Sequence, residues 1–227
     1  MSRVKQKSAD KGSQRWLQQM VERAPHAFEQ ALLPKLHPTG GGPVEWLSPR
    51  RDDDYAEYSD GAFLRRLDLK LGRESLKDFW PKRGPVWDGL ARTARGDVLL
   101  IEAKANMSEL ASPGTKASED SAKRIRKSLA AAKPAFGAPE DADWASTYYQ
   151  YANRLAHLYL LRQLNSISAY LVFLYFVNAT EVGGPTSVET WQPGIKALHE
   201  ALRLGGGPLT PYVLEVFVDI GTIGQGF

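Results

Sequence analysis

Residues 86–106 read VWDGLARTARGDVLLIEAKAN, and they contain the stretch that decides the fold. The run at 98–104 is apolar enough for a buried strand, although Glu102 and Lys104 interrupt it. A second strand is predicted at 85–92, and a short turn joins the two in an antiparallel hairpin. Charged side chains buried in such a hairpin must be paired with an opposite charge or bind a metal ion.

The two charges point the same way, because side chains alternate along a strand and Glu102 and Lys104 are two positions apart. With the turn centred near Arg95, antiparallel pairing places Asp88 directly across from Glu102. Carboxylates that face each other on a sheet repel, and burial makes the repulsion worse. Lys104 is one compensating cation. A bound divalent metal would be another, since carboxylate oxygens and water are the ligands that Mg²⁺ prefers.

This arrangement suits the hydrolysis of a phosphodiester. The cation would stabilise charge on the phosphate oxygens, and a lysine two residues after the second carboxylate can contact the attacking water or the phosphate. Removal of Glu102 is expected to raise the melting temperature in a chelator, because it relieves the repulsion. The alternative is that Glu102 and Lys104 form only a salt-bridged or solvated strand end.

Hydrophobic periodicity organises the rest of the chain into alternating helices and strands. A flexible basic arm is expected at 1–14, followed by a single domain at 15–227. The expected helices are 16–32, 55–69, 119–133, 144–164 and 188–204, and the further strands are 167–177 and 212–220. The first helix should end at Pro34 and the run HPTGGGP, and the second is entered through the acidic residues 52–54. This order predicts an α/β (α+β) fold with a mixed β-sheet flanked by helices.

Composition narrows the chemistry. The 227 residues include no cysteine, which excludes disulfides, thiolate metal sites and a cysteine nucleophile, so a metal must use oxygen or imidazole ligands. The polar N-terminus lacks the apolar core of a signal peptide, and no stretch is long and apolar enough to span a bilayer. We therefore expect a cytoplasmic protein that does not engage membranes. The net charge of +3 permits an anionic partner without requiring one.

The segments P-V-W-D and G-D-V-L-L-I-E-A-K, within residues 84–106, resemble the signature of the PD-(D/E)xK nuclease superfamily. The resemblance implies a restriction-endonuclease-like mixed sheet flanked by helices. It also implies that Asp88, Glu102 and the backbone carbonyl of Ala103 bind the metal. By the same resemblance, Lys104 assists the nucleophilic water.

Many members of that superfamily carry a further acidic residue on the helix before the hairpin. Glu57 and Asp60 are three residues apart, so they would share one face of the predicted helix, and we favour Glu57 as the additional metal ligand. A solvated acidic first turn is the alternative for either residue.

Two groups of residues are candidates for nucleic-acid binding. On the helix at 144–164 one face carries the polar stripe Gln150, Asn153, Arg154 and His157, and another carries the core stripe Tyr148, Ala152, Leu155 and Tyr159. Gln150 and Arg154 are the candidates for phosphate contacts, although a polar stripe is commonly the wet side of a helix. The densest basic cluster is Lys123, Arg124, Arg126 and Lys127, which could engage a nucleic-acid backbone or simply be a solvated face.

These observations predict a hydrolase: a Mg²⁺-dependent nuclease acting on nucleic acid, with DNA as the expected form and Mn²⁺ able to substitute. A homodimer or a partner protein is compatible with this expectation. The alternative is a non-catalytic nucleic-acid-binding or assembly subunit in which Glu102 and Lys104 merely pair. A third possibility is metal-assisted hydrolysis of another phosphate ester, such as a nucleotide.

Overall fold

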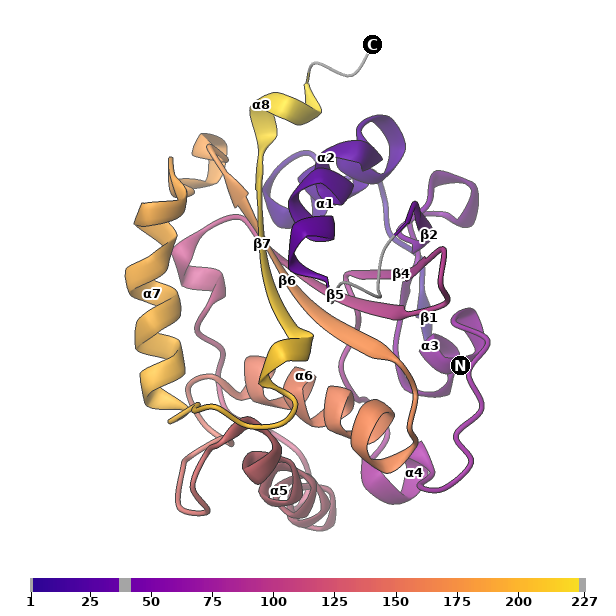
Figure 1. The fold of residues 1–227 in the computed structure, drawn as a ribbon, viewed down its shortest axis with the longest axis vertical. Coiled ribbons are helices and arrows are strands. Elements are labelled where there is room, and N and C mark those ends of the chain that lie inside the picture. The colour runs from indigo at the N-terminus through magenta and orange to yellow at the C-terminus, as the bar shows by residue number, and fades with distance from the viewer. Residues whose placement is uncertain (1, 37–41, 225–227) are drawn as a thin grey trace.

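The computed structural model describes residues 2–36 and 42–224, and a five-stranded mixed β-sheet lies at its centre (Figure 1). The strands are β2 (Val44–Ser48), β4 (Gly89–Thr93), β5 (Val98–Lys104), β6 (Ala169–Val177) and β7 (Val213–Asp219), and they lie side by side in this order. Strands β2, β4 and β5 pair antiparallel, whereas β5, β6 and β7 pair parallel. The predicted mixed sheet is confirmed.

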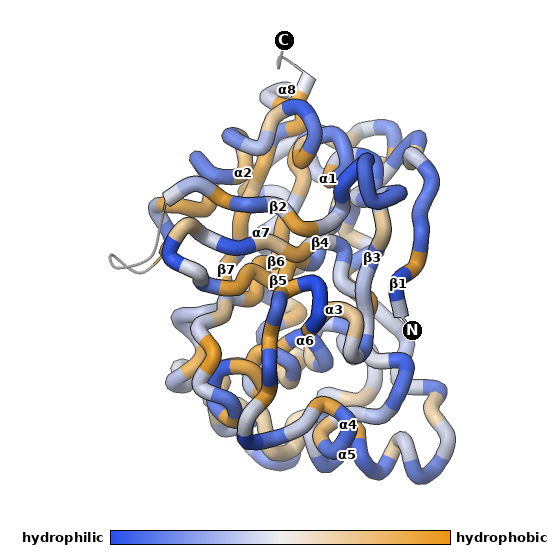
Figure 2. The backbone as a smooth tube through the Cα atoms, turned by 90° about the vertical axis from the view of Figure 1, so that its right-hand side faces the viewer, coloured by the Kyte–Doolittle hydropathy of each residue, from blue (hydrophilic) through white to orange (hydrophobic). Residues whose placement is uncertain are grey.

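The central strands are the most apolar part of the molecule. Every residue of β5 and β6 is buried, as expected where helices cover both faces of a sheet. Strand β7 lies at an edge, and buried positions alternate along it with more exposed ones. Figure 2 shows β5, β6 and β7 as mostly hydrophobic segments inside a more hydrophilic outer layer.

One face of the sheet is covered by the first two helices and the last. These are α1 (Gly12–Arg23), α2 (Pro25–Leu32) and α8 (Ile220–Ile223). They share a core with Leu99 and Ile101 of β5. Because the N-terminal helices pack on this face of the sheet, the β5 residues that point toward it, Leu99, Ile101 and Ala103, are apolar.

The opposite face of the sheet carries the remaining helices (Figure 1). They are α3 (Asp60–Arg66), α4 (Leu76–Phe79), α5 (Glu119–Ala132), α6 (Tyr149–Tyr159) and α7 (Val188–Ala201). Their core includes Val98 and Leu100, so Glu102 and Lys104 point toward this side. Neither these helices nor any other in the described part of the chain is long and apolar enough to cross a bilayer.

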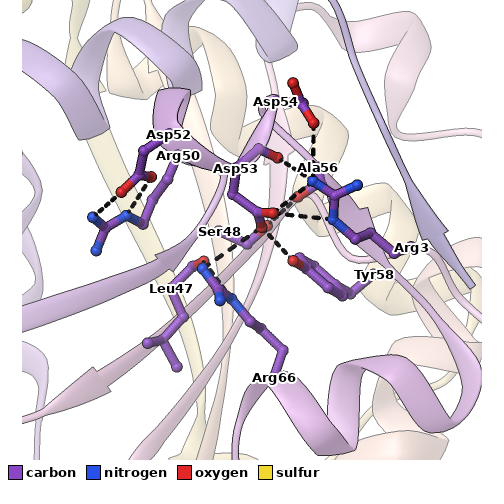
Figure 3. Close-up of polar contacts among 10 residues, drawn as sticks. All are labelled: Arg3, Leu47, Ser48, Arg50, Asp52, Asp53, Asp54, Ala56, Tyr58 and Arg66. Atoms are coloured by element: carbon purple, nitrogen blue, oxygen red, sulfur yellow. Dashed lines mark hydrogen bonds and ion pairs between the residues drawn. The ribbon is translucent and has the colours of Figure 1, made fainter.

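The N-terminal residues are tied to the fold instead of forming the flexible arm that we expected. Strand β1 (Arg3–Val4) pairs antiparallel with β3 (Glu57–Tyr58). The Arg3 guanidinium lies 2.6 Å from Asp53 and 3.1 Å from Asp54, within the network drawn in Figure 3. The acidic run therefore binds an arginine from the N-terminal segment. Asp52 and Asp53 lie in a short 3-10 helix, Arg51–Asp53, and the run does not open the predicted α-helix.

Helix boundaries differ from the predicted ones where a local signal competes with periodicity. The helix predicted at 16–32 begins earlier, at Gly12, and is divided in two, because Pro25 cannot donate a backbone hydrogen bond and opens α2. The helix predicted at 55–69 is shortened to α3, since β3 precedes it. Most of the run HPTGGGP lies outside the described residues, and β2 directly after it was not predicted.

Candidate functional site

The β4–β5 hairpin has the predicted register. Gly89 pairs with Ile101, so the next position outward sets Asp88 beside Glu102. Asp88 lies directly before β4, and its Oδ2 accepts a 2.8 Å hydrogen bond from the backbone N–H of Ala103. The two carboxylates therefore occupy neighbouring positions on adjacent segments.

Glu102 is only 2% exposed, yet two cations surround it. Lys104 Nζ lies 2.6 Å from its Oε1, and both Nε and Nη2 of Arg154 lie 2.7 Å from its Oε2. Burial raises the pKa of Glu102, but the attraction of Arg154 and Lys104 outweighs burial and holds the pKa below its ordinary value. The expected gain in stability on removing Glu102 is therefore reversed, because two buried cations would lose their partner.

Lys104 shares the face of β5 that carries Glu102, and its Nζ also lies 3.3 Å from Gln150 Oε1 on α6. Burial lowers the pKa of Lys104, whereas the charges of Glu102 and Asp88 raise it, and the net change is upward. The ammonium group is therefore charged at neutral pH and can only donate hydrogen bonds. The structure thus brings Gln150, a residue singled out by the helical pattern, to the lysine.

Asp88 has less compensation from nearby positive charge than Glu102, which forms two ion pairs. Burial, followed by repulsion from Glu102, raises its pKa to about 8, although Lys104 and the Ala103 N–H act in the opposite direction. Near neutral pH the carboxyl group therefore holds a proton for most of the time. A cation placed beside Asp88 would favour the ionised form.

Most of the polar stripe of α6 faces the interior, and only Gln150 at its start is half-buried. Asn153, Arg154 and His157 are all buried. Besides Glu102, Arg154 donates 2.8 Å hydrogen bonds to Asn153 Oδ1 and to the carbonyl of Val86. Its guanidinium therefore has several partners within the protein, and the phosphate contact expected for it stays a prediction. Burial lowers the pKa of His157 to about 4, so this imidazole is neutral.

Glu57 lies in β3 and not on a helix. Tyr58 forms a bridge with Trp87, and one further step along the two segments brings Glu57 alongside Asp88. Its carboxylate accepts hydrogen bonds of 2.9 Å from Gln6 and 3.1 Å from Gln14. Glu57 is thus held by side chains of the N-terminal segment.

The charge of Glu57 interacts with the hairpin at longer range. Burial raises the pKa of Glu57, the two glutamines lower it, and the negative charge of Glu102 raises it further. Asp60, the other acidic candidate, accepts hydrogen bonds from Gly84 N at 2.9 Å and Ser2 Oγ at 2.7 Å. Within residues 2–36 and 42–224, no group of three or more Asp, Glu, His or Cys side chains is placed to hold a metal ion.

A cleft of about 1140 Å³ opens above Asp88 and Lys104. Its walls come from the loop between α4 and β4, from the segment between β5 and α5, and from the first two turns of α5 and α6. Among the described residues its lining has six basic and three acidic side chains. Asp88 and Lys104 thus lie in a predominantly cationic cleft.

Only part of the basic cluster of α5 lines the cleft. Arg124 lines it and donates a 2.8 Å hydrogen bond to the carbonyl of Lys77, whereas Lys123, Arg126 and Lys127 are exposed outside the lining. Sequence reasoning missed Lys82 and Arg83, which line the cleft from the loop before Asp88. Their signal was a pair of basic residues a few positions ahead of the motif.

No protein-family model matches this chain, and neither a curated protein nor a solved structure matches it. The geometry of the hairpin, α6 and the cleft is therefore the basis for a functional assignment.

Proposed function

We propose that this chain is a metal-dependent phosphodiesterase of the PD-(D/E)xK type that cleaves nucleic acid, with DNA as the expected substrate. The observation that carries the proposal is the register that sets Asp88 beside Glu102, with Lys104 on the same face at the floor of a cationic cleft. An antiparallel hairpin followed by two helices and a parallel strand is compatible with a restriction-endonuclease-like fold. Fold alone would not assign a function.

The donor atoms at the hairpin suit a hard cation such as Mg²⁺ or Mn²⁺. A carboxylate has about four lone-pair sites, and the three donors from Lys104 and Arg154 leave Glu102 with room for one more contact. Asp88 would be the principal ligand, since a cation would relieve the cost of its ionisation. By the family resemblance, the Ala103 carbonyl would complete the protein ligands. The ion would stabilise charge on the scissile phosphate and on the leaving oxygen.

The protein side chains have separate tasks in this proposal. The Lys104 ammonium donates a hydrogen bond to the attacking water or to a phosphate oxygen, and it does not act as the base because it is already protonated. Gln150 limits where Lys104 can point. Arg154 keeps Glu102 ionised and fixed in orientation, so it is a positioning residue.

The direct test is cleavage of linear DNA, circular DNA and RNA by the purified protein in Mg²⁺, in Mn²⁺ and in EDTA. Lys104→Met keeps most of the side-chain volume and should abolish cleavage, as should Asp88→Asn. Lys123→Gln, an exposed change outside the cleft, is the matched control and should retain activity. Metal-dependent cleavage that survives in both site variants would overturn the assignment, provided that unfolding curves show all proteins folded.

A non-catalytic binding subunit is the second candidate, and the double pairing of Glu102 favours it. Arg154 and Lys104 already neutralise the buried carboxylate, so the fold needs no metal at that residue. Stabilisation by Mg²⁺ separates the two candidates, because only a protein that binds the ion in its folded state gains stability from it. A melting temperature that is unchanged by Mg²⁺, together with no cleavage, would favour the binding subunit.

A further inference from the structure

Three exposed cations of the cleft lie outside the basic cluster of α5. Lys82 and Arg83 lie in the loop before Asp88, and Lys116 lies in the segment that leads to α5. All three side chains are exposed and line the cleft. They come from two segments that are more than thirty positions apart in sequence but meet at one opening.

Helix α5 presents two different faces. Asp120, Ser121, Arg124 and Ile125 line the cleft, with the spacing of one helical stripe. Lys123, Arg126 and Lys127 have the spacing of a second stripe, which is exposed and does not line the cleft. Only Arg124 of the basic cluster therefore adds charge to the opening above Asp88 and Lys104.

We infer that the phosphodiester backbone of the substrate follows this cleft and contacts Lys82, Arg83, Lys116 and Arg124, while the outer stripe of α5 makes no contribution to binding. The inference rests on the proposed function, because a strand cleaved beside Asp88 must enter the same opening. Exposed lysines and arginines bind phosphates largely without regard to sequence, and they release counterions as they do so. The slope of log affinity against log salt therefore reports how many such phosphate contacts the protein makes.

The experiment compares two triple variants that remove the same number of charges. The cleft variant carries Lys82→Gln, Arg83→Gln and Lys116→Gln, and the control carries Lys123→Gln, Arg126→Gln and Lys127→Gln. Arg124 is left intact because its hydrogen bond to Lys77 links α5 to α4. Binding to a labelled single-stranded oligonucleotide and to the matched duplex is measured by fluorescence anisotropy in EDTA, between about 50 and 200 mM salt.

The cleft variant should lower the slope of log affinity against log salt by about 2 on a single strand and by nearly 3 on a duplex. Across that salt range its affinity should then fall about 20-fold less than the wild type's on a single strand, and about 40-fold less on a duplex. The strand type that shows the change is the one that occupies the cleft. The control should keep the wild-type slope.

Equal slopes for the cleft variant and the wild type would overturn the inference, as would an equal drop in the control or an absence of binding by the wild type. The result is separable from the proposed function. A wild type that cleaves while the cleft variant keeps its slope refutes the cleft path alone. A wild type that never cleaves, but whose binding depends on the cleft cations, refutes catalysis alone.

Discussion

Replacement of Asp88 by asparagine tests the central electrostatic claim without assuming any activity. Asparagine keeps the size of the side chain and an oxygen that can accept the Ala103 hydrogen bond, but it cannot ionise. In the wild type, folding raises the pKa of Asp88 from 3.8 to about 8. An acid whose pKa is higher in the folded state destabilises the protein progressively as the pH rises above its unfolded value.

The pKa shift sets an upper limit on the effect. At about 1.4 kcal/mol for each pKa unit, the penalty in the wild type could reach about 4 kcal/mol at pH 7. Asp88 borders a cleft in which water screens its charge, so we expect the variant to be more stable by about 1–2 kcal/mol. The gain should be close to zero near pH 4, should grow with pH and should level off above about pH 8.

Urea unfolding in EDTA, followed by tryptophan fluorescence from acidic to mildly alkaline pH, measures this difference. Asp120→Asn is the control, because it removes one acidic side chain from the same cleft at an exposed position. A stability difference between Asp88→Asn and the wild type that is flat with pH, or largest at the acidic end, would refute the reasoning.

Three further changes test the surroundings of Asp88. Arg154→Met should cost about 3–5 kcal/mol in urea unfolding, because it leaves Glu102 buried with one cation; a loss below about 1 kcal/mol would contradict this role. Glu102→Gln should lower the melting temperature measured by calorimetry in EDTA. A higher melting temperature would instead mean that repulsion between Asp88 and Glu102 outweighs the two ion pairs of Glu102. Mg²⁺ should raise the melting temperature of the wild type more at pH 8 than at pH 6, since protons compete for Asp88. That pH-dependent gain should be absent from Asp88→Asn, and an equal gain at both pH values would argue against Asp88 as the ligand.

The hairpin could be predicted from sequence because its determinants are local. A two-residue side-chain period and a short turn are enough to set Asp88 beside Glu102, and the structure has that register. The buried strand β6 was equally clear from its unbroken apolar run. Strand β2 had a weaker signal, in which buried Val44 and Trp46 alternate with the exposed Glu45.

The role of Arg154 could not be predicted in this way. It lies 52 positions from Glu102, and helical spacing shows only that it belongs to a polar stripe. Whether such a stripe faces water or a buried carboxylate depends on how α6 packs against the sheet. The N-terminal segment posed the same problem, because the two-residue strands β1 and β3 are too short for periodicity to reveal.

The separation of Glu102 from Arg154 along the chain has a consequence for the order of folding. The β4–β5 hairpin closes a short loop and can form early, but it brings two carboxylates together, and Lys104 offsets only part of their repulsion until α6 supplies its guanidinium. Early closure of the hairpin is therefore opposed by its own charges, and it becomes favourable once α6 docks. The hairpin and α6 should accordingly gain structure in the same kinetic step, in which Arg154 forms its ion pair with Glu102.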